Sequence, residues 1–272
     1  MDKSVNYIKQ AALALDKIRS GKPLVHSLTN YVVMNQTANI LLHIGASPVM
    51  AHAQEEVEEM AALAGALVLN IGTLDPYWVE SMIMAGRAAN AKGVPVVLDP
   101  VGAGATRFRT DSCMRILEQV KVDLIRGNSA EVSILAGMEA KIKGVDAVGT
   151  ADTHAAIARR AAEVFGVAAA VTGAQDAVSD GITTLLIDNG HPLLGELTGT
   201  GCMATALTGA FLAVEKDPLA AALGALVSFG IAGEWAAKVS QFPGSFQVAL
   251  FDEVYRLRGV DLTEGARVVV GS

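Results

Sequence analysis

Two glycines, two hydroxyl groups and a thiol stand together at Thr198, Gly199, Thr200, Gly201 and Cys202, just before an apolar stretch of helical character. The glycines permit a tight turn, and the N–H groups of a helix start would converge on one point with the positive end of the helix dipole. This arrangement predicts an anion site. In the first helical turn the dipole is expected to lower the pKa of the Cys202 thiol. A small buried cysteine that packs a helix start is the alternative for Cys202 taken alone.

Two other glycine motifs compete for the same turn. Residues 199–204 fit G-x-G-x-x-A, the dinucleotide-binding fingerprint, which requires a strand directly before it and an acidic residue about 20 positions later at the next strand end. Residues 221–227 have helical character instead, so a dinucleotide-dependent oxidoreductase is the weaker alternative, which NAD(P) binding would support. The P-loop motif G-x-x-x-x-G-K-[ST] is absent, because Gly21-Lys22 is the sole Gly-Lys pair and lacks that context. A P-loop NTPase is excluded.

Polar residues close to glycines follow the predicted strands at Asn70, Asp99, Asn128 and Thr172. In open parallel sheets, ligands bind at the edge where the strands have their carboxyl ends. Each residue alone could be an ordinary helix cap, and Thr172 could contact a nucleotide phosphate or merely bond to the backbone. The four together favour a binding site at this edge.

A pair of acidic residues accompanies two of these strand ends. Asp99 precedes a glycine loop whose N–H groups could approach an anion, and Glu131 stands beyond the next strand, together with Arg126. Mg²⁺ usually takes one or two carboxylates plus phosphates and waters, so Asp99 and Glu131 are a suitable pair. A helix-capping carboxylate is the alternative for either residue, and Ser129 could cap the helix that contains Glu131.

The elements that position these residues are short apolar runs that alternate with longer helical patterns. This alternation predicts an α/β fold, with βα units on a mostly parallel central sheet flanked by helices. The candidate strands are Leu24–Ser27, Pro48–Ala51, Ala66–Ile71, Val94–Asp99, Val122–Arg126 and Val167–Thr172. No repeat or linker divides the sequence, so residues 1–272 are expected to form a single domain.

Three further patterns complete the expected fold. Asp180-Gly181 between two apolar runs predicts a β-hairpin, with strand residues from 182 to 187, and therefore an antiparallel edge to the sheet. After Gly201 the chain is expected to be almost wholly helical, and residues 219–239 are too apolar for a lone surface helix. A first helix is expected over Asp2–Arg19, with an apolar face made of Val5, Ile8, Ala12, Leu15 and Ile18.

Composition limits the class of protein. The 272 residues are 51% apolar and 18% charged, which is enough to bury a large core. A net charge of -7 without a basic stripe argues against nucleic acid as a partner. Cys113 and Cys202 are too few for a disulfide framework, and no signal peptide or membrane-spanning pattern is present, so a cytoplasmic protein without a membrane partner is expected.

Four segments, taken together and in this order, resemble the ribokinase-like superfamily: Asp99-Pro-Val-Gly-Ala-Gly, Arg126-Gly-Asn-Ser-Ala-Glu131, Val171-Thr-Gly173 and Thr198-Gly-Thr-Gly-Cys202. Four further segments look like those of the hydroxyethylthiazole kinases within it: Pro23–Asn30, Gly45–Ala51, Leu69–Leu74 and Pro243–Phe246. The resemblance extends from about Pro23 to Leu250. It implies a ribokinase-like fold and ATP-dependent phosphorylation, with Mg²⁺, of the hydroxyl of 4-methyl-5-(2-hydroxyethyl)thiazole in thiamine salvage.

The resemblance also implies roles for particular residues and a quaternary structure. Members are homotrimers with active sites between subunits, so the surroundings of Asn30 could serve a neighbour's site. The implied contacts are Met50, Gly199 and Asn30 with the thiazole substrate, Arg126 and Thr172 with ATP, and Asp99 and Glu131 with the metal.

Cys202 departs from the aspartate that takes the alcohol's proton in most ribokinase-like enzymes, although the thiazole branch can carry cysteine there. Positioning and charge neutralisation supply most of the catalysis of phosphoryl transfer, so a cysteine is compatible with it. We hypothesise that N–H groups from Gly199 to Cys202 hold the charge of the transferred phosphate and that Cys202 places or deprotonates the hydroxyl. A kinase for a pyrimidine precursor and a catalytically inactive binding protein are the remaining alternatives, and a panel of substrates separates them.

Overall fold

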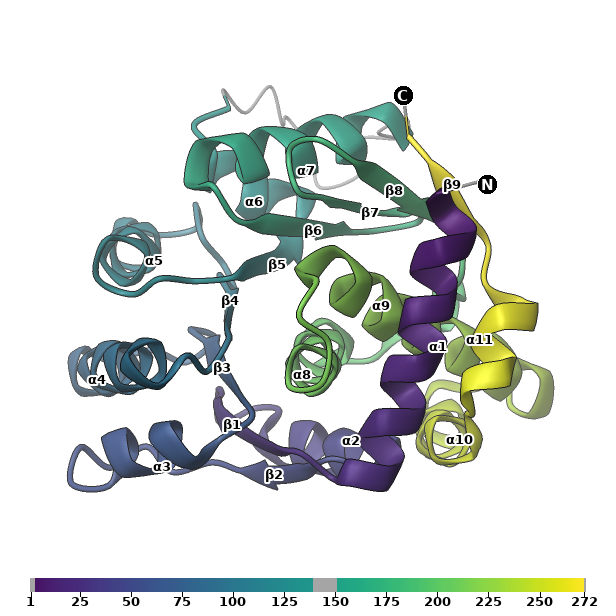
Figure 1. Ribbon diagram of the computed structural model, residues 1–272, viewed down its shortest axis with the longest axis horizontal. Helices are drawn as coiled ribbons and strands as arrows, with labels where there is room; N and C mark the ends of the chain where they lie inside the picture. The colour runs from purple at the N-terminus through teal and green to yellow at the C-terminus, as the bar shows by residue number, and fades with distance from the viewer. Residues whose placement is uncertain (1–2, 139–150, 272) are drawn as a thin grey trace.

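The computed structural model describes residues 3–138 and 151–271, with side chains described from residue 154 in the second range, and its strands form one nine-stranded sheet (Figure 1). The strand order is β2-β1-β3-β4-β5-β6-β7-β8-β9, parallel from β2 to β6 and antiparallel from β6 to β9. The strands are β1 (Leu24–Leu28), β2 (Ser47–Val49), β3 (Ala66–Asn70), β4 (Val96–Asp99), β5 (Leu124–Asn128), β6 (Ala168–Thr172), β7 (Asp176–Ser179), β8 (Thr184–Ile187) and β9 (Val268–Val270).

Helices cover both faces of this sheet, so the chain has three layers. The helices are α1 (Lys3–Gly21), α2 (Met34–Ile44), α3 (Val57–Leu63), α4 (Pro76–Lys92), α5 (Arg107–Gln119), α6 (Ser129–Leu135), α7 (Ala151–Phe165), α8 (Thr200–Leu212), α9 (Pro218–Val239), α10 (Pro243–Arg256) and α11 (Gly259–Gly265), with one 3-10 helix, η1 (Pro192–Glu196). Figure 1 shows α3, α4 and α5 on one face and α8, α9 and α1 on the other. The α/β class is confirmed.

Alternation along the strands assigns side chains to the two faces. In β3, Leu67 and Leu69 pack in the core under α3, α4 and α5, whereas Ala66 and Val68 pack in the core with α8 and α9. Successive side chains of a strand point to opposite faces, and both faces are covered, so β3 is apolar throughout except at its last residue, Asn70. A polar residue at the end of such a strand is therefore placed directly at the sheet's edge.

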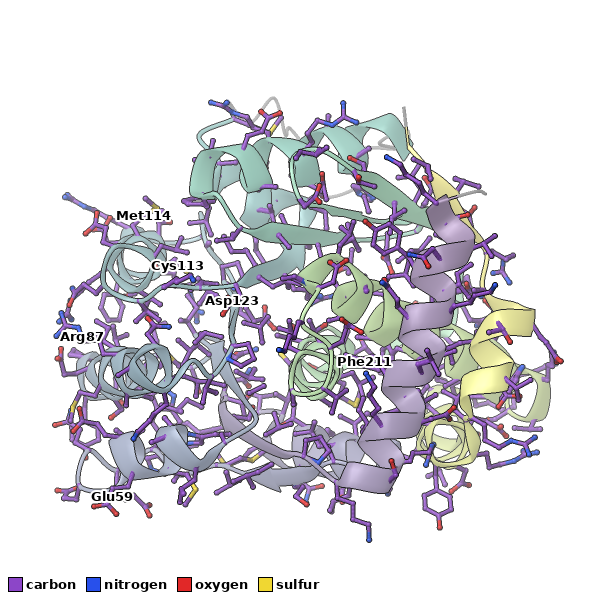
Figure 2. All side chains as sticks on the ribbon, viewed as in Figure 1. Glu59, Arg87, Cys113, Met114, Asp123 and Phe211 are labelled. Atoms are coloured by element: carbon purple, nitrogen blue, oxygen red, sulfur yellow. The ribbon has the colours of Figure 1, made fainter. Side chains whose placement is uncertain are left out.

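Small residues let α8 and α9 lie close to their neighbours. A Cβ atom at Gly209 of α8 would lie 2.5 Å from a methyl group of Val68, and one at Gly224 of α9 would lie 2.5 Å from the ring of Phe211. Figure 2 labels Phe211 on α8. The most apolar 18-residue stretch of α9 is 89% buried within the protein, although α9 is long and apolar enough to cross a membrane. The expectation that residues 219–239 are not a lone surface helix is confirmed.

The observed elements correct the expected ones in three places. The hairpin between β7 and β8 is present, but residues 180–183 form its turn and Ile182 is 89% exposed, because the Asp180 carboxylate accepts the N–H groups of Ile182 and Thr183. Val5 is 45% exposed, so it lies outside the buried face of α1. Strand β9 follows the last helix of the part expected to be almost wholly helical, and it was not predicted because a run of three valines is too short to show a periodicity.

Candidate active site

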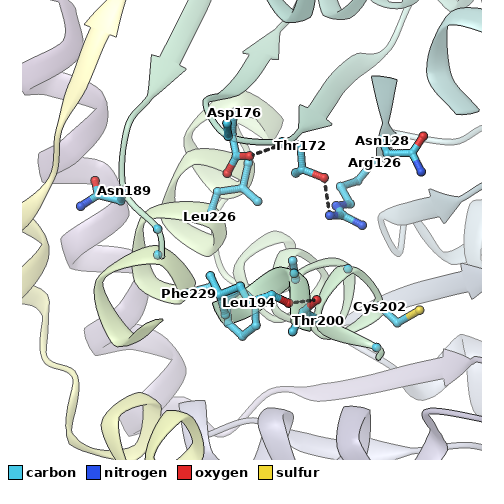
Figure 3. Close-up of a pocket in the computed structure, with 18 of the residues that line it drawn as sticks. Arg126, Asn128, Thr172, Asp176, Asn189, Leu194, Thr200, Cys202, Leu226 and Phe229 are labelled. Carbon is cyan, nitrogen blue, oxygen red and sulfur yellow. Dashed lines mark hydrogen bonds between the residues drawn. The ribbon is translucent and has the colours of Figure 1, made fainter. Parts of the chain in front are cut away.

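A cavity of about 750 Å³ opens where the carboxyl ends of the parallel strands meet the start of α8 (Figure 3). It lies at the edge of the sheet where the sequence predicts a ligand. Eight of the predicted site residues line it: Asp99, Arg126, Glu131, Thr172, Gly199, Thr200, Gly201 and Cys202. The structure therefore brings together side chains from β4, β5, β6, α6 and α8 that are far apart in the sequence.

The predicted turn before α8 is confirmed. Gly199 has a φ of 88° and precedes the helix, which begins at Thr200, and a Cβ atom at Gly199 would lie 2.5 Å from Val33. Only glycine adopts this conformation without strain. The Thr200 hydroxyl donates to the Leu194 carbonyl at 3.0 Å, so it fastens the turn to η1 (Figure 3). Because a 3-10 helix precedes the turn instead of a strand, the dinucleotide-binding motif lacks its required context.

Arg126 on β5 places a buried guanidinium against this turn. It donates to the Thr172 hydroxyl on the neighbouring strand, and a Cβ atom at Gly201 would lie 2.8 Å from its Nη1. Within the described ranges, its Nε–H has no hydrogen-bond partner. A buried cation is costly, and an anion in the cavity that Arg126 lines would compensate for its charge. Gly201 permits the guanidinium to lie this close to the start of the helix.

Asp99 is buried at the end of β4 and receives two hydrogen bonds on one oxygen. Asn70 Nδ2 donates to its Oδ2 at 2.8 Å, and Thr205 Oγ1 donates to the same atom at 2.7 Å. Burial raises the pKa of Asp99 to about 6, Arg126 opposes this rise, and the negative charge of Glu131 adds to it. Among the described residues, none donates a hydrogen bond to the second oxygen, Oδ1.

Asn30 reaches the same cluster from the amino-terminal part of the chain. Its Nδ2 donates to Asn70 Oδ1 at 2.8 Å and lies 3.5 Å from the Cys202 sulfur. The backbone N–H of Val32 donates to its Oδ1 at 3.1 Å, so the amide orientation is fixed. Met50 follows β2 and is half-buried, and neither Met50 nor Asn30 lines the cavity of the single chain. The structure thus joins Asn30 to the site and leaves Met50 apart from it.

The expectation that the helix start lowers the pKa of Cys202 is wrong. Burial raises the pKa of this thiol to about 11, and the negative charge of Asp99 raises it further. Hydrogen bonds from Asn70 and Asn30 and the charge of Arg126 lower it by less. Removal of the thiolate from water outweighs the partial charges of the helix start. Cys202 is therefore a neutral thiol at physiological pH.

Glu131 takes part in the capping arrangement that was its alternative interpretation. Its Oε2 accepts the Asn128 N–H at 2.9 Å, and the Asn128 side chain accepts the Glu131 N–H at 2.9 Å. The residue that caps α6 is thus Asn128, whereas the sequence pattern suggested Ser129. Glu131 Oε1 also accepts the Gly102 N–H at 2.8 Å, which ties the glycine loop after β4 to the start of α6. The described residues contain no cluster of three or more potential metal ligands.

Two residues of this region escape the sequence analysis. Asp176 lines the cavity, accepts the Gly173 N–H at 2.9 Å, and has a pKa that burial raises to about 6 (Figure 3). Thr205 lies beneath the cavity and bonds to Asp99. An acid four positions after Thr172 at the start of the hairpin is a signal that could have indicated Asp176. A hydroxyl one turn beyond Gly201 in an apolar helix could have indicated Thr205, although Thr208 in the same helix gives the same signal.

Comparison with known proteins extends over nearly the whole chain. The sequence profile of the Hydroxyethylthiazole kinase family matches residues 15–259. A hydroxyethylthiazole kinase of Desulforudis audaxviator is 54% identical over 257 residues, which are 94% of this chain and 94% of the relative. One from Desulfatibacillum aliphaticivorans is 50% identical over 264 residues, which are 97% of this chain and 98% of the relative.

Solved structures agree with this result. The hydroxyethylthiazole kinase protein of Pyrococcus horikoshii superposes with a TM-score of 0.90 at 50% identity, and the match covers 96% of this chain and 99% of that one. A pyridoxal kinase of Staphylococcus aureus, solved in complex with pyridoxal, matches with a TM-score of 0.61 at 16% identity over 92% of this chain and 98% of that one. The second likeness concerns the fold alone.

Proposed function

This chain belongs to the hydroxyethylthiazole kinase family, and from that premise we propose that its cavity transfers the γ-phosphate of ATP to the hydroxyl of 4-methyl-5-(2-hydroxyethyl)thiazole. The product would be a thiazole phosphate, and its use in thiamine biosynthesis is consistent with the name of the family. One observation carries the assignment of the site: the start of α8, the buried Arg126 guanidinium and the Asp99 carboxylate meet in one cavity. Phosphoryl transfer requires this combination of positioning and charge neutralisation.

The proposed roles follow from what each group offers. Arg126 and Thr172 bind ATP phosphates, because the buried guanidinium and the Thr172 hydroxyl lie next to each other and both residues line the cavity. N–H groups from Gly199 to Cys202 hold the charge of the phosphate during transfer. The Cys202 thiol places the substrate hydroxyl and does not deprotonate it, because its raised pKa leaves almost no thiolate at neutral pH.

Asp99 and Glu131 are the residues that would hold Mg²⁺, and the donor set fits that ion. Asp99 has an oxygen to which none of the described residues donates a hydrogen bond, and each oxygen of Glu131 accepts a backbone N–H. Mg²⁺ is usually bound through one or two carboxylates, with phosphates and waters as its other ligands. When bound, the ion would neutralise charge on the phosphate oxygens.

We also propose that residues 1–272 form one kinase domain that acts in the cytoplasm as a homotrimer with sites between subunits. Asn30 is hydrogen-bonded to Asn70 and Cys202, while the next two residues, Tyr31 and Val32, are 60% and 59% exposed in the single chain. Together with the position of Met50 outside the cavity, this supports a neighbouring subunit that completes the thiazole site. Sedimentation of the purified protein at trimer mass is expected, and a monomer with full activity would contradict it.

The function is tested by release of ADP in a coupled assay with the purified chain, ATP and Mg²⁺. Turnover with the thiazole alcohol is expected, together with much lower turnover of a hydroxymethylpyrimidine and of pyridoxal. A folded protein that binds ATP but phosphorylates one of these other alcohols preferentially would assign the site to a different substrate. Absence of turnover with every alcohol would contradict the proposed reaction.

A further inference from the structure

A continuous set of hydrogen bonds between buried side chains lies beneath the cavity. It joins Asn30, Asn70, Asp99 and Thr205, which come from the loop after β1, the ends of β3 and β4, and the middle of α8. All four residues are 4% exposed or less. The parallel register places Asn70 directly beside Asp99, so the two side chains meet because of the strand pairing.

The pattern of donors and acceptors allows one orientation of the Asn70 amide. Its Oδ1 accepts from Asn30 and from the Gly72 N–H at 3.0 Å, and its Nδ2 donates to Asp99. If the amide were rotated, two donors would face Nδ2 and two acceptor oxygens would face each other. The orientation of Asn70 therefore dictates which groups it can hold.

The two hydrogen bonds to Asp99 fall on the same oxygen. Asn70 and Thr205 approach Oδ2 from different elements, at 2.8 Å and 2.7 Å. A carboxylate held at one oxygen by two donors has little rotational freedom. Its other oxygen, which has no donor among the described residues, is left for the contents of the cavity that Asp99 lines.

We propose that Asn70 and Thr205 are positioning residues of the reaction, which hold Oδ2 of Asp99 so that Oδ1 is presented to the cavity. Asn70 also joins this carboxylate to Asn30, whose amide lies beside Cys202, so the metal side and the alcohol side of the site are held in one geometry. The inference rests on the proposed function, because it assigns Asp99 a part in that reaction.

A matched pair of threonines on α8 tests the role of Thr205. Thr208 is also fully buried, and its hydroxyl donates to the Ala204 carbonyl of its own helix at 2.8 Å. The Thr205 hydroxyl makes a longer contact of the same kind with the Gly201 carbonyl, at 3.3 Å, in addition to its bond to Asp99. Thr205→Val and Thr208→Val make the same chemical change one turn apart. Thr205→Val is expected to lower kcat by about 10- to 100-fold, the usual range for residues that orient a ligand, while Thr208→Val leaves kcat within about twofold.

Two further measurements separate positioning from a general structural defect. Thr205→Ser keeps the hydroxyl and is expected to restore most of kcat, and the KM for ATP should change little in either Thr205 variant. Isothermal titration with ADP should show that Thr205→Val binds metal-free ADP normally but loses the gain in affinity that Mg²⁺ produces. Equal loss of ADP affinity with and without Mg²⁺ would overturn the role, because it would place the defect in the nucleotide pocket.

Asn70→Asp tests the other donor. It keeps the acceptor for Asn30 and Gly72 but replaces the donor toward Asp99 with a second carboxylate, so a larger loss of kcat than in Thr205→Val is expected. Wild-type activity in Asn70→Asp, or equal activity in Thr205→Val and Thr208→Val, would overturn the proposal. If wild-type protein itself fails to phosphorylate the alcohol, the proposed function fails, and the ADP titrations still decide whether Thr205 acts through Asp99.

Discussion

The two edges of the central sheet use polar side chains differently. At the carboxyl edge, Asn70, Asp99 and Thr205 bond mainly to one another and surround a cavity. At the amino edge, the side chains bond to backbone: Asp123 accepts the Val96 N–H at 2.8 Å, and Asn90 bonds to both the carbonyl and the N–H of Lys121.

Hollows alone do not distinguish these edges. The amino edge also has hollows, with cavities of about 410 Å³ and 490 Å³ that are both lined by Lys121 and Asp123. The two edges differ in whether their polar side chains form hydrogen bonds with the backbone or with other side chains. A side chain that pairs with backbone stabilises the fold, because a buried backbone group without a partner is costly. Side chains that pair with one another, together with an Arg126 Nε–H that has no partner among the described residues, indicate a ligand.

The largest expected effect is at the carboxyl edge, in Asp99→Asn. This change keeps the size of the side chain but removes the charge that the proposed reaction uses. We expect kcat to fall by about 100- to 1,000-fold while the unfolding midpoint is not lowered, because a preorganised charge acts on the reaction and not on the fold. Steady-state ADP release and thermal unfolding measure the two quantities. Turnover within tenfold of wild type would remove Asp99 from the proposed mechanism.

A substitution of Asp176 tests whether an ionised side chain at the same edge lowers the free energy of unfolding. Burial raises its folded-state pKa to about 6 from 3.8, so the ionised form is disfavoured in the folded protein. That cost is absent below pH 3.8 and fully developed above about pH 6. Asp176→Asn keeps an acceptor for the Gly173 N–H and is therefore expected to raise the free energy of unfolding by up to about 3 kcal/mol at neutral pH.

The measurement for Asp176 is urea denaturation of both proteins from pH 4 to pH 8. The difference between Asp176→Asn and wild type should grow as the pH rises through this range. A constant difference, or a variant that is less stable at pH 8, would contradict the sign worked out from the raised pKa.

At the same carboxyl edge, substitutions of Cys202 are expected to change turnover less than Asp99→Asn does. If its neutral thiol positions the hydroxyl, Cys202→Ala should leave turnover within about tenfold of wild type, since removal of one positioning contact costs roughly 1 kcal/mol. Cys202→Asp should keep or raise kcat, because a carboxylate there can accept the proton. The coupled ADP assay compares the three proteins at saturating ATP. Complete loss in Cys202→Ala with ATP binding intact would show that the thiol does more than position the substrate.

The smallest expected effect belongs to the amino edge. Asp123→Ala removes the acceptor of the Val96 N–H and should lower the free energy of unfolding by about 1 kcal/mol without a change in kcat. Asp123→Asn retains an acceptor oxygen and is the matched control, with stability near that of wild type. Urea denaturation and the ADP assay check both. A fall in kcat for Asp123→Ala would show that the two edges are not as distinct as their hydrogen bonds indicate.

Much of the fold and part of the site could be predicted from the sequence, because the signals are local. Apolar runs predicted six of the strands, and the glycines at 199 and 201 predicted a turn before a helix. Polar residues at strand ends predicted the edge at which Asp99, Arg126 and Thr172 meet. The prediction that Val5 belongs to the apolar face of the first helix was wrong, and strand β9 was missed. Burial at the end of a helix and a partner for a three-residue strand both depend on distant segments.

By itself, the sequence determined most of the elements, the conformation that Gly199 must adopt and the chemical groups available for phosphoryl transfer, because these depend on residue type and near neighbours. The tertiary structure alone decided that Thr205 shares an oxygen of Asp99 with Asn70, and that Cys202 is a neutral thiol. Hydrogen-bond partners across the sheet follow from strand register and helix placement, and a pKa follows from burial. Both arise only when distant segments pack together.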